Sequence, residues 1–225
     1  MNYRDFQPGA TTRVRESIEW STTYSYNATD TINPRVLLIG DSICNGYQSA
    51  VRQKLGQRAN ITFWASSKCV TDPDYFRELD FMLDSYPYAL VSFNNGLHSL
   101  KTSREEWVEA YRAAVRFIRA KLPDAALVLT LCTALNDPAK NEIAKRINAD
   151  AAAIAEEYRL PVIDLFTPMD SLDKASAMAD VFHYKAPAID IQAGIIADFV
   201  TGALGLTDGD ICQHPTETGP SGALK

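Results

Sequence analysis

The sequence predicts a three-layer α/β/α fold built on a five-stranded parallel sheet. Five short, continuously apolar runs recur between residues 35 and 165, and segments with helical periodicity separate them. Continuous apolar runs indicate strands that are buried on both faces. Their alternation with helices predicts parallel strands with helices packed on both sides of the sheet. The 225 residues, of which 46% are hydrophobic, are enough for one such domain.

The elements are expected in a regular order along the chain. Strands are expected at residues 35–40, 61–64, 88–93, 125–131 and 160–165. Helices are expected at residues 46–55, 72–84, 103–122, 139–158 and 189–204. Ser103, with Glu106 three residues later, predicts a capping box. Asp72 before Pro73 predicts an N-cap followed by a proline in the first turn.

The composition divides the chain into three segments. Residues 1–34 are polar and rich in Thr, Ser, Tyr and Asn, so we expect an irregular N-terminal arm. Residues 35–206 hold all the predicted elements and form the domain. Residues 207–225 are rich in Gly, Pro and Thr, which predicts a C-terminal surface tail with an exposed His214.

Charge and hydropathy limit the partners and the location. A net charge of −6 and a pI near 5.1 argue against nucleic acid and against an anionic membrane surface. No apolar run approaches the roughly 20 residues of a membrane span, and the start lacks the pattern of a secretory signal. The sequence predicts a cytoplasmic protein, or a secreted or periplasmic one if a leader has been removed. The oligomeric state is left open.

The four cysteines show neither a CxxC motif nor the spacing of a metal finger. Three of them, Cys44, Cys69 and Cys132, lie in or beside apolar segments, which favours buried structural thiols. A bridge between Cys44 and Cys69 stays open as an alternative, because both follow strands that should be neighbours.

Chemically active side chains follow the predicted strands. Ser42 follows the first strand, Asn94 and Asn95 follow the third, and Asp180 and His183 precede the last helix. The carboxyl ends of parallel strands meet at one edge of a sheet, so these side chains should lie together. A serine hydroxyl needs a base to act as a nucleophile. A spacing of three residues lets a carboxylate reach Nδ1 of a histidine whose Nε2 faces the serine.

Three of these segments, GDSIC, FNNGLH and DVFH, resemble in order and placement the first, third and fifth sequence blocks of the SGNH/GDSL hydrolases. These are serine esterases with a flavodoxin-like fold. The resemblance implies that Ser42 is the nucleophile and an oxyanion donor through its N–H group. It implies further that Asp180 and His183 complete the catalytic triad. The third block of the family reads GxND, which makes Asn94 the side-chain donor to the oxyanion, with Asn95 as the fallback.

The second block departs from the family. A glycine is expected after the second strand, but residues 65–69 read ASSKC. Because the donor is a main-chain N–H group, Ser66 or Ser67 can replace it, and we expect Ser67. Asn95 and His98 are candidates for substrate binding. His98 has two further readings, either orienting Asn95 or capping the following helix.

The predicted function is hydrolysis of a small O-acyl ester through an acyl-serine intermediate, without metal or organic cofactor. FNNGLH resembles a variant block of subgroups linked to carbohydrate O-acyl chemistry, so the expected substrate is an acetylated saccharide. Two alternatives stay open. One is acyl transfer to a sugar by the same triad, and the other is a catalytically silent binding protein that keeps the fold.

Overall fold

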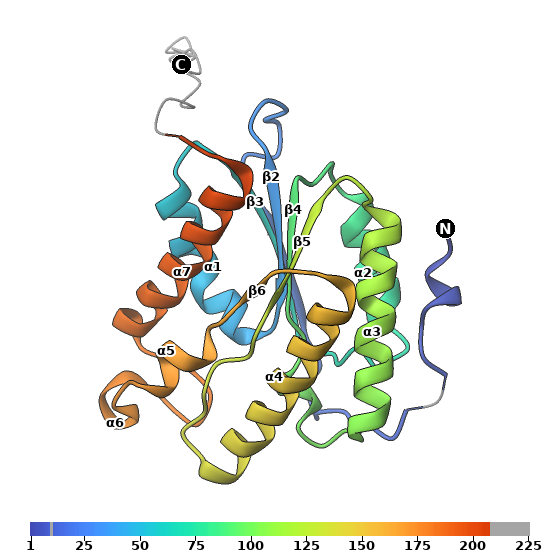
Figure 1. Cartoon of the computed structure of the whole chain (residues 1–225), viewed down its shortest axis with the longest axis vertical. Coiled ribbons are helices and arrows are strands. Elements are labelled where there is room, and N and C mark those ends of the chain that lie inside the picture. The colour runs from blue at the N-terminus through green and yellow to red at the C-terminus, as the bar shows by residue number, and fades with distance from the viewer. Residues whose placement is uncertain (10, 208–225) are drawn as a thin grey trace, which may run out of the picture.

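A computed structural model describes residues 1–9 and 11–207, in which one mixed sheet lies between two helical layers (Figure 1). The sheet has six strands in the order β1-β3-β2-β4-β5-β6. All pairs among β2 to β6 are parallel, as predicted. The strands are β1 (Ser21–Ser25), β2 (Arg35–Gly40), β3 (Asn60–Ser66), β4 (Leu90–Phe93), β5 (Ala126–Thr130) and β6 (Val162–Ile163).

The sixth strand comes from the N-terminal arm, and here the expectation of an irregular arm was wrong. β1 pairs antiparallel with β3, from Ser21 opposite Ser66 to Ser25 opposite Thr62. Its sequence, STTYS, has no apolar run because it lies at an edge and is largely exposed. The polar strand supplies hydrogen bonds to the outer side of β3 and needs no core face of its own.

Helices cover both faces of the sheet (Figure 1). α1 and α7 pack together on one face, and α2, α3 and α4 lie on the other. The three short helices α5, α6 and η2 were not expected, and neither was η1 at the start of the arm. The helices are η1 (Tyr3–Asp5), α1 (Ser42–Leu55), α2 (Tyr75–Asp84), η2 (Leu97–Ser99), α3 (Arg104–Lys121), α4 (Pro138–Tyr158), α5 (Phe166–Asp170), α6 (Lys174–Ala177) and α7 (Ala186–Leu204).

The predicted helix starts have mixed outcomes. Ser103 caps α3 by accepting a hydrogen bond from the Glu106 N–H group (3.4 Å). The other half of the capping box is absent, because the Glu106 carboxylate accepts from the N–H and the hydroxyl of Thr12 in the arm. Asp72 does not cap α2, whose N-cap is Asp74. Asp72 is instead fully buried and accepts from the Cys69 N–H group (2.8 Å).

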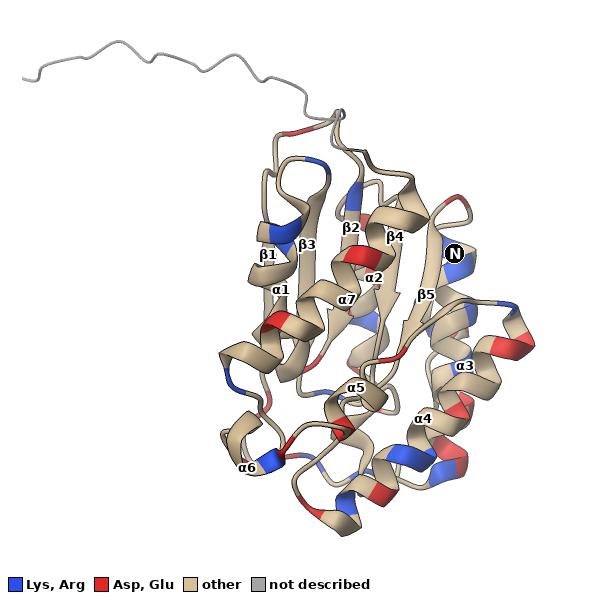
Figure 2. Cartoon of the chain, turned by 60° about the vertical axis from the view of Figure 1, so that its left-hand side comes forward, with Lys and Arg blue, Asp and Glu red and all other residues tan. Residues whose placement is uncertain are grey.

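The outer surfaces of α3 and α4 carry both charge signs (Figure 2). Two ion pairs join these helices, Arg104 to Asp150 (2.6 Å) and Arg112 to Glu157 (2.9 Å). On the opposite face, α7 is long and apolar enough, by length and composition alone, to cross a membrane, a criterion that a core helix can also meet. One side of it packs in the core against α1, as a core helix does.

The core lies on both faces of the central strands, and β2, β3 and β4 are buried along their whole length. Cys44, Cys69 and Cys132 are buried free thiols, as favoured by the sequence, so the alternative of a Cys44–Cys69 bridge was wrong. Burial raises the pKa of the Cys44 and Cys132 thiols to about 12. Cys212, His214 and the predicted tail beyond residue 207 lie outside the described residues.

Candidate active site

Ser42 begins the helix that follows the central strand β2. Asp41 ends the turn between them by accepting a hydrogen bond from the Ile43 N–H group (2.9 Å) with its Oδ1. Gly40 lies so close to Cys44 that a Cβ there would collide with that side chain. As the first residue of α1, Ser42 has an N–H group without an intrahelical acceptor. That group can therefore donate to a ligand.

A tight turn before α7 holds the predicted histidine and carboxylate. Asp180 Oδ1 closes the turn by accepting from the N–H groups of Phe182 (2.7 Å) and His183 (2.8 Å). Tyr184 anchors the turn, because its buried hydroxyl donates to the Ala134 carbonyl (2.6 Å). Local hydrogen bonds to Asp180 thus close the turn, and Tyr184 ties it to the segment that follows β5.

The structure brings Ser42, His183 and Asp180 into one hydrogen-bonded chain. Ser42 Oγ lies 2.8 Å from His183 Nε2, and His183 Nδ1 lies 2.8 Å from Asp180 Oδ2. The pKa of Asp180 is lowered to about 2 by hydrogen bonds from the His183 N–H group, from the imidazole and from the Phe182 N–H group. An ionised carboxylate at Nδ1 fixes the tautomer in which Nε2 accepts the serine proton.

These side chains are open to solvent. His183 is 46% exposed and Asp180 is 54% exposed at the side chain. A cavity that Asp41 and Asn94 help to line has a volume of about 10 Å³. That is about the space one water molecule needs, so it cannot hold an acyl group. A substrate would meet Ser42 from the outer edge of the sheet.

The two asparagines after β4 have different surroundings. Asn95 is 4% exposed, and both ends of its amide are used. Its Oδ1 accepts from the Val70 N–H group (3.0 Å), and its Nδ2 donates to the Lys68 carbonyl (2.8 Å). Asn94 is only partly buried, and its Nδ2 donates to the Thr130 carbonyl (2.6 Å). The second hydrogen on Nδ2 is directed at Cys132 Sγ (3.5 Å), a weak acceptor that an oxyanion can replace, so Asn94 is the better placed donor and Asn95 a brace.

The loop after β3 differs from the predicted oxyanion site. The Ser67 N–H group donates to the Trp20 carbonyl (3.1 Å), which contradicts its expected role as an oxyanion donor. The physical reason is β1, because the arm that leads into this strand continues the ladder beside β3. The next three N–H groups also have acceptors within the protein. Lys68 donates to Ser66 Oγ (3.1 Å), Cys69 donates to the Asp72 carboxylate, and Val70 donates to Asn95 Oδ1.

The arm also reaches His98. His98 Nδ1 lies 2.7 Å from Glu16 Oε1, and its ring meets the Trp20 ring edge-on, with 6.2 Å between centroids. His98 therefore neither orients Asn95, whose amide has other partners, nor caps α3, which Ser103 does. Its predicted part in substrate binding stays a prediction.

Glu19 ties the arm to the same loop. It accepts hydrogen bonds from Ser67 Oγ (2.6 Å) and Arg13 Nη1 (3.2 Å). Burial acts to raise the pKa of Glu19. It is outweighed by these two hydrogen bonds, by a third from the Glu16 N–H group and by the charge of Arg13, so the pKa lies below its usual range. Glu19 is therefore a carboxylate facing a buried cation.

The sequence matches no protein-family model, and no curated protein matches it. Solved structures match the fold. A GDSL-like lipase from Bacteroides thetaiotaomicron aligns with a TM-score of 0.59 and 19% identity, over 75% of this chain and 88% of the lipase. The acetyl xylan esterase AlAXEase gives a TM-score of 0.63 and 15% identity, over 74% of this chain and 99% of the esterase. A catalytic mutant of an acetylxylan esterase from Geobacillus stearothermophilus gives a TM-score of 0.60 and 16% identity, over 79% of this chain and 98% of the esterase.

The chain has the SGNH/GDSL hydrolase fold. Within that fold, the order β3-β2-β4-β5-β6 reproduces the flavodoxin-like arrangement 2-1-3-4-5. Ser42 and Asn94 follow β2 and β4, the two strands between which the order of connections reverses. Ligands bind at this point in open α/β sheets.

The sequence did not predict that the N-terminal arm contacts the loops beside the candidate site. Arg13, Glu19 and Trp20 contact the loops after β3 and β4, yet they lie more than 45 residues away in sequence from Ser67. A basic residue in a polar segment gives no signal of burial. Asp72 gave no such signal either, because its position before Pro73 indicates an N-cap, whereas in the structure its buried carboxylate pairs with Arg13.

Proposed function

We propose that the protein is a serine esterase that hydrolyses a small O-acyl ester, with an acetylated carbohydrate as its substrate. The observation that carries the proposal is the hydrogen-bonded chain from Ser42 Oγ through His183 to Asp180 Oδ2. The acetyl xylan esterases among the structures of the same fold support the acetyl group and the carbohydrate.

In the first half of the reaction, Ser42 Oγ attacks the ester carbonyl carbon while His183 Nε2 takes the hydroxyl proton. Asp180 stabilises the imidazolium that forms. The negative charge on the former carbonyl oxygen is met by the Ser42 N–H group and by Asn94 Nδ2. The intermediate then collapses, the bond to the alcohol breaks, and His183 returns the proton to the leaving alcohol. Ser42 is left acylated.

In the second half, water replaces the alcohol. His183 takes a proton from water as its oxygen attacks the acyl carbon, and the same two donors meet the new oxyanion. Collapse breaks the bond to Ser42 Oγ, which regains its proton from His183, and the carboxylic acid leaves. The residues present are sufficient for every proton transfer in this cycle.

Hydrolysis of 4-nitrophenyl acetate and of acetylated xylo-oligosaccharides by wild type and S42A tests the proposal. We expect S42A to lose activity by at least about 10³-fold, because no other group replaces the nucleophile. The matched control is S176A, which removes the hydroxyl of an exposed serine that bonds the Asp173 carbonyl, and it should keep full activity. An inactive wild type, or an S42A variant that keeps the wild-type rate, would refute the esterase.

A further inference from the structure

A buried arginine from the N-terminal arm lies between the loops that follow β3 and β4. The Arg13 side chain is 2% exposed. Its Nη2 donates to the Ser67 carbonyl (2.8 Å), and its Nε donates to the His98 carbonyl (3.4 Å). Nη1 donates to the carboxylates of Glu19 (3.2 Å) and Asp72. One guanidinium therefore holds main-chain atoms of both loops at once.

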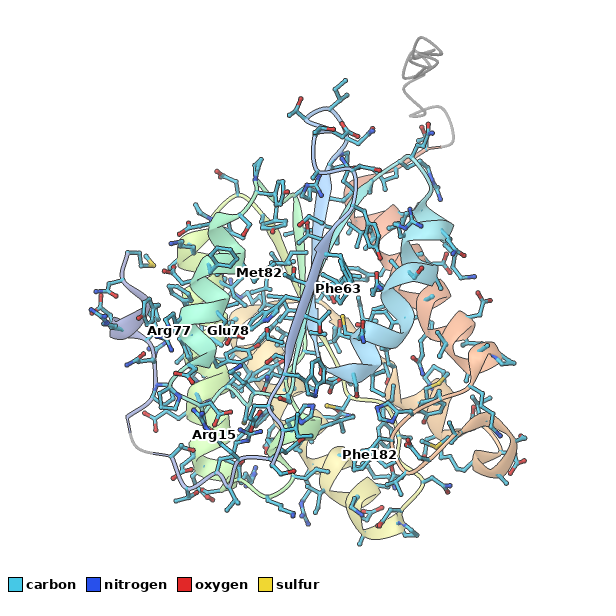
Figure 3. All side chains as sticks on the ribbon, turned by 180° about the vertical axis from the view of Figure 1, so that it is seen from behind. Arg15, Phe63, Arg77, Glu78, Met82 and Phe182 are labelled. Atoms are coloured by element: carbon cyan, nitrogen blue, oxygen red, sulfur yellow. The ribbon has the colours of Figure 1, made fainter. Side chains whose placement is uncertain are left out.

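These two loops stand on either side of the candidate nucleophile. β3 and β4 are the two neighbours of β2, and Ser42 follows β2. The His98 carbonyl that Arg13 holds lies four residues after Asn94, in the short helix η2 of the same connection between β4 and α3. Figure 3 shows Arg15, from the same arm, and Phe182, from the turn that holds His183, both in the lower part of the view. The arm thus borders the edge that carries the site.

The chemistry of the contact depends on the shape of the guanidinium. Arginine directs five N–H donors from one plane, whereas lysine offers three donors from a single point. Only the arginine fork can meet two carbonyls and two carboxylates from different directions. A buried ion pair is weak evidence of stabilisation, because desolvation offsets the attraction. Defined geometry is the better explanation for Arg13.

We propose that Arg13 is a positioning residue for ester hydrolysis and acts through the loop that carries Asn94. By holding the His98 and Ser67 carbonyls on one guanidinium, it fixes the spacing of the two loops and so the place of the Asn94 amide. The kinetic consequence rests on the proposed function, whereas the place of the amide can be measured without turnover. A misplacement of about 1 Å can cost about 100-fold in rate.

The test compares R13K with R35K. Arg35 is also buried, at the opposite end of β2, where its guanidinium donates to the carbonyls of Tyr26 (2.8 Å) and Asn27 (2.7 Å). We expect R13K to lower kcat for 4-nitrophenyl acetate by about 10- to 100-fold with KM changed less than about threefold. R35K should keep kcat. In two-dimensional amide NMR spectra, R13K should shift the Asn94 side-chain signals, assigned by their absence in N94A, and R35K should not.

Each outcome decides the proposal. An R13K variant with unchanged Asn94 signals and unchanged kcat overturns it, and so does an R35K variant that loses kcat equally. If the wild type hydrolyses no ester but R13K shifts the Asn94 signals, the positioning role stands and the proposed function is refuted. If R13K does not fold, E19Q replaces it, because Glu19 holds the outer side of the guanidinium. E19Q must then shift the Asn94 signals and lower kcat severalfold, and unchanged values overturn the proposal.

Discussion

Two regions meet at the carboxyl end of β2 and are held in different ways. The turn with His183 is closed by its own residues, since Asp180 accepts two N–H groups from within three positions. The loops after β3 and β4 are held from far away in sequence, by Arg13, Glu19 and Trp20 of the arm. The pairing of Asp180 with His183 therefore depends mainly on local sequence, whereas the oxyanion side depends on tertiary structure.

Of the two regions, the locally closed histidine turn should show the larger loss of activity. D180N should lower kcat by about 10³–10⁴-fold, because an amide at this position favours the wrong tautomer of His183. The amide oxygen can still accept the Phe182 and His183 N–H groups, so the turn should keep its shape. Steady-state kinetics together with the NMR signals of these two N–H groups check both parts. A loss below about 10-fold would mean that Asp180 does not orient the base.

A smaller loss is expected on the oxyanion side. N94A should lower kcat by about 10²–10³-fold with KM little changed, because removing one donor costs about 2.7–4 kcal/mol of transition-state stabilisation. N60A is the matched control, since Asn60 is a buried asparagine at the far end of the sheet that bonds Asn27 and the Asn33 carbonyl. If N94A and N60A reduce kcat equally, Asn94 is no oxyanion donor.

The smallest effect is expected where the histidine turn is anchored. Y184F removes the hydroxyl that donates to the Ala134 carbonyl (2.6 Å) and should lower the free energy of unfolding by about 1 kcal/mol. Because Asp180 still closes the turn, kcat should change by less than about threefold. Urea unfolding and kinetics check this, with Y88F as the control for loss of a buried tyrosine hydroxyl bond, here to the Met82 carbonyl (3.1 Å). A large loss of kcat in Y184F alone would show that the turn is not held locally.

The same contrast explains what could be predicted from the sequence. The five parallel strands and the approach of Ser42, Asp180 and His183 follow from local patterns: apolar runs, the residues after each strand, and a three-residue spacing. β1 could not be predicted, because an edge strand that contributes little to the core shows no hydrophobic pattern. The Ser67 prediction was wrong for the same reason, since its N–H partner, the Trp20 carbonyl, lies in the segment leading to that strand.

The two outermost strands also bear on self-association. An exposed sheet edge presents unpaired N–H and C=O groups and can recruit a strand from another molecule. One edge of this sheet is β1, whose STTYS sequence is polar, and the other is β6, which has two residues. A polar edge and a very short edge both give poor templates for strand addition. By covering the apolar β3, the arm therefore protects the sheet against edge-to-edge aggregation.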